Sequence, residues 1–198
     1  MSLQSLKEII NNNVVDILSE IGEGTKPFPF KLLKDKEVPD ANEEGATKYI
    51  VEYQIDTPNI PILVNLVSYS KYKKYGVYLD FQALTSKDGT TNVDDKYKVT
   101  DEGLSVMFGI LTTIKEILKD FLTRYDIKIF SLTYVSANTS KDDSASDSEK
   151  QDKALKRHKL YVAYIKKLFP EAIVNESRFP LFKVMVFFRR LVGVEDIK

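Results

Sequence analysis

Three segments in the first half of the chain have the pattern of β-strands: residues 48–56 and 77–83 alternate in side-chain character with the period of a strand, and residues 62–69 form a second, mostly apolar run between them. In the third segment Val77, Leu79 and Phe81 alternate with Tyr78 and Asp80. Successive side chains of a strand point to opposite faces, so this alternation predicts strands that bury one face. The short polar stretches between the segments predict an antiparallel meander.

Three other segments repeat apolar residues with the period of a helix, over residues 3–21, 104–122 and 155–168. Thr100 precedes the second segment and is suited to cap a helix, because Asp101 and Glu102 follow in the first turn. Ser148 and Gln151 fit a capping box before the third segment. The pattern therefore predicts an N-terminal helix and two long central helices.

The remaining segments complete a single α+β domain over residues 1–198. Residues 127–135 are β-branched and aromatic, and residues 182–192 are apolar on both faces, which predicts an interior fifth strand. The proline-containing segment 22–47 is predicted to connect the N-terminal helix (3–21) to a sheet–helix core over 48–192, and the Ser- and Asp-rich segment 138–147 to be a mobile loop. The predicted fold is a five-stranded, mainly antiparallel sheet with two long central helices and an N-terminal helix.

Composition excludes several classes of function. The 198 residues contain 29 Lys plus Arg and 29 Asp plus Glu, so the chain has no long-range positive field to attract nucleic acid. There is no cysteine, which excludes disulfides and thiolate metal sites. No stretch is apolar for the length of a bilayer, so no membrane partner is expected.

The motifs that carry common chemistries are missing from the sequence. His158 is the single histidine and lies among basic residues, which does not suit a metal ligand or a general base. The chain has no glycine-rich phosphate loop and no nucleophile elbow. We therefore predict no catalytic, cofactor-binding or metal-binding residue, and we expect a protein that is not an enzyme.

Clusters of basic and aromatic residues form the candidate interaction surface. They could contact nucleic acid or an acidic protein surface, or they could be solvated turns. Arg157 and Tyr161 are four residues apart and are expected to share one face of a helix. The candidate residues are Lys71, Tyr72, Lys73, Lys74, Arg157, Lys159, Tyr161, Arg189 and Arg190.

Five pieces of the chain resemble a group of small tailed-phage α+β proteins. They are a strand at 77–83, a T-x-x-G turn at 100–103, an apolar helix at 106–122, a strand at 127–137 and an R-x-K-L-Y segment at 157–161. The resemblance covers about half of the chain and implies a phage origin and an acyltransferase-like layout. The glycine-rich turn Q/R-x-x-G-x-G/A, with which such enzymes hold coenzyme A, is missing.

These observations favour a non-enzymatic phage accessory or virion-associated structural protein that acts by protein–protein assembly. Its expected partners are other virion or phage proteins or copies of itself, first in the host cytoplasm and then in the virion, and no cofactor is expected. One alternative is a degenerate acyltransferase that uses Tyr134, Tyr161 or Ser136. The other is a nucleic-acid-binding accessory protein that uses residues 71–74, which the zero net charge does not favour.

Overall fold

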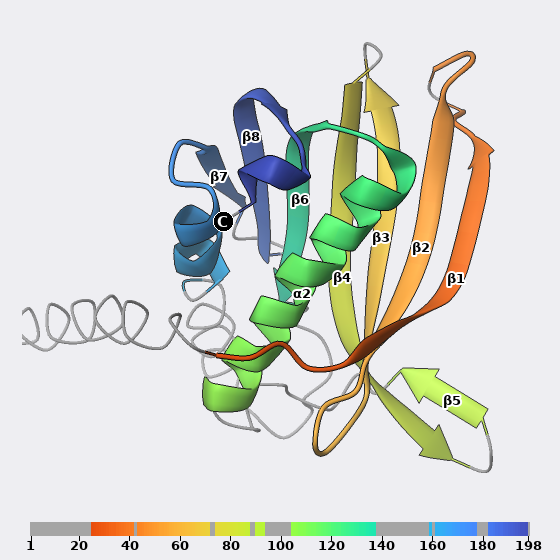
Figure 1. Cartoon of the computed structure of the whole chain (residues 1–198), viewed down its shortest axis with the longest axis vertical. Helices are drawn as coiled ribbons and strands as arrows, with labels where there is room; N and C mark the ends of the chain where they lie inside the picture. The colour runs from red at the N-terminus through yellow and green to blue at the C-terminus, as the bar shows by residue number, and fades with distance from the viewer. Residues whose placement is uncertain are drawn as a thin grey trace, which may run out of the picture.

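A computed structural model describes residues 25–41, 43–71, 74–87, 90–93, 104–137, 159, 161–177 and 182–197. The predicted helix at 3–21 and the predicted mobile loop at 138–147 lie outside these residues. The described part is built mostly from one sheet of eight strands (Figure 1). The strands are β1 (Phe30–Pro39), β2 (Thr47–Ile55), β3 (Ile62–Lys71), β4 (Lys74–Lys87), β5 (Thr90–Val93), β6 (Ile129–Ala137), β7 (Ile173–Ser177) and β8 (Phe182–Val192).

Seven strands lie side by side in the order β1-β2-β3-β4-β6-β8-β7, and β5 pairs with the far end of β4. Strands β1 to β4 form an antiparallel meander, while β4 and β6 are parallel. Parallel strands need a long crossover, and the helix α2 (Leu104–Tyr125) supplies it. Strand β8 then pairs with β6 and β7 in antiparallel orientation, as an interior strand.

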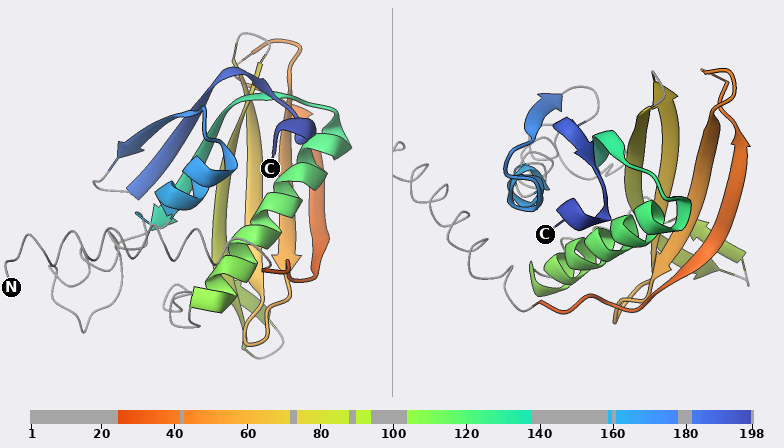
Figure 2. Two further views of the ribbon diagram at one scale, coloured as in Figure 1. Left: turned by 60° about the vertical axis from the view of Figure 1, so that its left-hand side comes forward. Right: turned by 45° about the horizontal axis from the view of Figure 1, so that its top comes forward.

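Helix α2 forms the core against one face of the sheet (Figures 1 and 2). Its apolar residues recur at the helical spacing, and Phe108, Ile117 and Phe121 are buried among Val51, Tyr53 and other side chains of the strands. The chain leaves the helix at Asp126, whose φ of 49° ends the helical path. A second helix at residues 161–168 lies beside α2 on the same face, and the 3-10 helix η2 (Val194–Asp196) follows β8.

The predicted fold class was wrong in the size of its sheet and in its helices. The sheet is mixed and has seven strands in its main order, and α2 is the one long helix among the described residues. The second central helix is described over 161–168, with its earlier part outside the described residues. The extra strands are β1 and β7, which are edge strands, and β5, which pairs in antiparallel orientation with the far end of β4.

The segment before β1 crosses the outer side of α2 and is fixed there by one threonine. The hydroxyl of Thr113 accepts a hydrogen bond from the backbone N–H of Phe28 at 2.7 Å and donates one to the carbonyl of Gly109 at 2.7 Å. The ring of Phe28 lies against Gly109, where a Cβ atom would be 2.4 Å from it. Glycine is therefore required at this position for the segment to lie close to the helix.

We predict that Thr113→Val lowers the free energy of unfolding by about 1–3 kcal/mol, because the buried N–H of Phe28 loses its acceptor without a change in side-chain volume. Thr123→Val is the control, since its exposed hydroxyl donates only to the carbonyl of Lys119 in its own helix. The control should change the free energy by less than about 0.5 kcal/mol. Urea unfolding of both variants measures the difference, and equal losses would contradict the role of Thr113.

Candidate functional site

The two faces of the sheet differ in what covers them. Both the long helix α2 and the helix at 161–168 lie on one face, and no described helix lies on the other, which we call the open face (Figure 2). The strand register places apolar and aromatic side chains across it, among polar ones such as Asn65, Asp80 and Gln82: they are Ile50, Val67, Tyr69, Tyr78, Met185, Phe187 and Ile173, with Ser131 and Thr133 between them. Open faces of antiparallel sheets usually carry polar residues, so this apolar and aromatic content is a candidate for binding.

Tyr69 is held in one position on the open face by two neighbouring strands. It pairs with Gly76 on β4, where an added Cβ would meet the Tyr69 ring at 2.2 Å. The ring therefore passes over the glycine, and its hydroxyl shares a 2.7 Å hydrogen bond with the hydroxyl of Ser131 on β6. Burial raises the pKa of the Tyr69 phenol further above physiological pH, so the phenol is neutral.

Two further aromatic rings adjoin Tyr69. The ring centre of Tyr78 lies 4.9 Å away at an interplanar angle of 37°, and that of Phe130 lies 6.0 Å away in an edge-to-face contact. Tyr78 is 47% exposed, although it lies between buried positions of β4. An aromatic ring in solvent beside a fixed one forms a surface on which a planar group can stack.

The structure brings four of the predicted interaction residues to one end of the sheet. Lys71 and Lys74 are opposite each other at the end of the β3–β4 hairpin. Strand β6 begins beside the start of β4, and its Ile129 pairs with Val192, which places Arg189 and Arg190 near the same end. Arg190 is paired with Asp196, and Arg189 is exposed.

The other predicted residues do not join this group. Tyr72, Lys73 and Arg157 lie outside the described residues. Lys159 is exposed, next to the helix at 161–168 on the covered face, and Tyr161 is buried in the core. The basic helical segment that suggested a surface role for Tyr161 thus carries a core-facing side.

A second candidate site lies where the parallel pairing of β4 and β6 stops. Their register ends at Leu79 and Tyr134, after which β6 continues to pair with β8 and β4 continues along β3 and then β5. The carboxyl ends of parallel strands with a crossover helix are a common place for ligands. Here three aromatic rings, those of Phe81, Tyr134 and Tyr161, pack together at centre distances of 5.1–5.9 Å.

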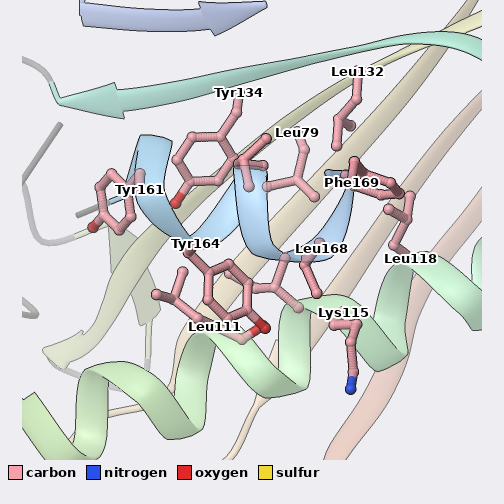
Figure 3. Close-up of a pocket in the computed structure, with 12 residues that line it drawn as sticks. Leu79, Leu111, Lys115, Leu118, Leu132, Tyr134, Tyr161, Tyr164, Leu168 and Phe169 are labelled. Carbon is pink, nitrogen blue, oxygen red and sulfur yellow. The ribbon is translucent and has the colours of Figure 1, made fainter. Parts of the chain in front are cut away.

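The space beside these rings is a small apolar cavity of about 20 Å³ between α2, the helix at 161–168 and the sheet (Figure 3). Such a volume accommodates about one water molecule. Lys115 is the one charged residue among those that line it. The cavity is far too small for a nucleotide cofactor.

The hydroxyl of Tyr134 is buried and has no hydrogen-bond partner among the described residues. Burial, with the nearby phenol of Tyr161, raises the pKa of Tyr134 well above its usual value. The hydroxyl of Tyr164, by contrast, donates to the carbonyl of Leu111 at 2.9 Å. Burial also raises the pKa of Tyr164, and the hydrogen bond with Thr112, which lowers it, does not offset the burial, so neither tyrosine is prepared to act as a base.

Sequence reasoning selected the neighbouring Lys71 and Lys74 but did not join the residues of this cluster, which are Tyr69, Tyr78, Phe130 and Gly76. The signal that could have found the cluster is Tyr78, an aromatic residue at a position where the alternation of β4 predicts a polar one.

Among the described residues there is no cluster of His, Asp or Glu suited to a metal ion. No helix within them has the length and apolar character needed to cross a membrane.

We predict that Tyr134→Phe leaves the free energy of unfolding unchanged or raises it by about 1 kcal/mol, because it removes a buried hydroxyl without a partner. Tyr164→Phe is the matched variant and should lower the free energy by about 1 kcal/mol, since it removes a hydrogen bond to α2. Denaturant unfolding tests both. A clear loss in Tyr134→Phe would show that its hydroxyl has a partner in the folded protein.

The chain matches no protein-family model, no curated protein and no solved structure.

Proposed function

We propose that the protein is a non-enzymatic phage accessory or virion-associated structural protein that assembles through the open face of its sheet, with a second copy of the chain as the first partner. The observation that carries the proposal is the apolar part of this face on β7 and β8. Ile173 is 49% exposed and pairs with the partly buried Phe187, and the partly buried Met185 follows two residues earlier on β8. An exposed apolar side chain beside partly exposed ones is typical of a protein–protein contact.

The open face has the size that a specific interface needs. Seven strands about 4.8 Å apart, with about nine residues each at about 3.3 Å per residue, make a surface of roughly 34 by 30 Å. This area of about 1,000 Å² exceeds the roughly 800 Å² that each partner buries in a standard interface. A second sheet face packed on it at about 10 Å would complete a two-layer sandwich.

The phage assignment rests on the resemblance of the T-x-x-G turn and the R-x-K-L-Y segment to small tailed-phage proteins. Other virion or phage proteins are then the further partners, and the host cytoplasm followed by the virion is the proposed location. Mass spectrometry of purified particles tests this part of the proposal. A stoichiometric amount of the chain supports a virion component, and its absence restricts the role to assembly.

We predict that Ile173→Asp weakens self-association at least about tenfold, because the carboxylate would have to lose its hydration in the contact. Val194→Asp is the control: Val194 is 38% exposed, but it lies on η2, which contacts α2 on the covered side of the sheet. Light scattering after size-exclusion chromatography over a range of concentrations gives the association constants. A wild-type protein that stays monomeric at every concentration, or equal effects of both variants, would overturn assembly through this face.

A second candidate, a degenerate acyltransferase, is favoured by one observation. The parallel strands β4 and β6 diverge after Leu79 and Tyr134, and Tyr134 and Tyr161, which we had considered for such chemistry, meet at that point. The side chain of Ser136 lies outside the described part of the chain. The cavity of about 20 Å³ between the described residues does not accommodate coenzyme A, so the first candidate is preferred.

Calorimetric titration with coenzyme A separates the two candidates. We predict no measurable heat of binding for the wild type. Binding that Tyr161→Ala abolishes, in a variant that keeps the wild-type circular dichroism spectrum, would instead favour acyl transfer at the divergence of β4 and β6.

A further inference from the structure

The corner of the open face around Tyr69 differs chemically from the apolar region on β7 and β8. We call it the aromatic–basic corner and define it by Tyr69, Tyr78, Lys48, Lys71 and Lys74. Lys48 is the residue of β2 that pairs with Val38 of β1, and two residues further along β2 Ile50 pairs with Val67 of β3. Continuing this antiparallel register by two residues on each strand puts Lys48 beside Tyr69. Lys71 and Lys74 close the corner at the end of the hairpin.

The two tyrosine rings of the corner are arranged for stacking. Tyr69 lies across Gly76 and is fixed by the bond to Ser131, so it loses little freedom when a ligand binds. Tyr78 lies 4.9 Å from it and is about half exposed. No described element covers the pair, and each exposed aromatic ring can take one face of a flat partner.

The charges of the corner suit an anionic partner. Lys71 and Lys74 are direct cross-strand neighbours and both are exposed, so two positive charges lie close together at this end of the hairpin. The next outward-pointing residue of β4 after Tyr78 is Asp80, whose carboxylate already accepts from the amide groups of Asn65 at 2.9 Å and Gln82 at 3.3 Å. An anionic ligand would therefore place its charge toward the lysines and away from Asp80.

We propose that the aromatic–basic corner binds single-stranded nucleic acid, with a base stacked on Tyr78 and the adjoining phosphates at Lys48, Lys71 and Lys74. A single strand is favoured over a duplex because its bases are free to stack on protein rings. It is favoured over an acidic protein segment because carboxylates would use the lysines but not the fixed aromatic pair. The site needs none of the assembly residues on β7 and β8, so it does not rest on assembly, but it lies on the same open face. A second copy that covered the whole face would therefore compete with the nucleic acid.

The test is fluorescence anisotropy of a fluorescein-labelled oligothymidylate with the full-length chain. We expect binding at low salt whose logarithmic salt dependence has a slope of about −2, from three phosphate contacts at about −0.7 each. Tyr78→Ala should weaken binding about tenfold, because a stacked base is lost, whereas Tyr78→Phe should stay within about twofold. Tyr78 is exposed, and thermal melting confirms that both variants are folded.

Two controls separate this site from nonspecific charge and from assembly. Lys74→Glu should weaken binding, whereas Lys166→Glu, which makes the same change in net charge on the covered side of the sheet, should not. Ile173→Asp should retain binding. The proposal is overturned if the oligonucleotide does not bind at low salt, if wild type and Tyr78→Ala bind it with equal affinity, or if the two lysine variants have equal effects. It is also overturned if polyglutamate at equal charge concentration displaces the oligonucleotide, because that result would indicate an acidic protein partner.

Discussion

The burial of α2 on a single face of the sheet is the constraint on which the rest of the structure depends. The helix connects the parallel strands β4 and β6, which are neighbours in the sheet, so it must pack against the sheet to which both strands belong. Its buried residues, such as Ile117 and Phe121, meet side chains from β2 as well as from the central strands. This packing arrangement makes β4 and β6 neighbours in the sheet and fills the core. It leaves the opposite face with no helix packed on it among the described residues.

Polar contacts hold the outer strands of the meander to the end of the same helix. The phenol of Tyr53 donates to Asp120 at 2.6 Å, and Arg124 binds the same carboxylate at 3.0 Å. Tyr125 stacks on Tyr49 of β2 with ring centres 4.0 Å apart and donates to Asp35 of β1. Burial raises the pKa values of Tyr53 and Tyr125, so both phenols remain hydrogen-bond donors at physiological pH. The β1–β2 edge is therefore fixed to α2 and does not close over the open face.

The sequence predicted most of the elements but not how they are combined. Strands β2 and β4 were found because their alternation is regular, β3 because it is a mostly apolar run, and α2 because its apolar stripe is broad. Strand β1 was missed because prolines flank it and lysines alternate along it, which suits an edge strand as well as a loop. The five residues of β7 are too few for a period, and the parallel pairing of β4 and β6 is a contact between distant segments. No local pattern shows on which side the helices pack, so the exposure of Tyr78 and the burial of Tyr161 could not be predicted.

The zero net charge, which disfavoured nucleic acid at the level of the sequence, is compatible with a basic corner because strands sort charges by face. In β1 the run Lys34-Asp35-Lys36-Glu37 is neutral, but alternation places the two lysines on the open face, where Lys34 pairs with Glu52 and Lys36 is exposed. The two carboxylates fall on the side of α2, where Asp35 meets Tyr125. Lys48 extends the same side of β2 toward Tyr69. Composition averages over both faces, whereas a ligand on the sheet meets the charge of one face only.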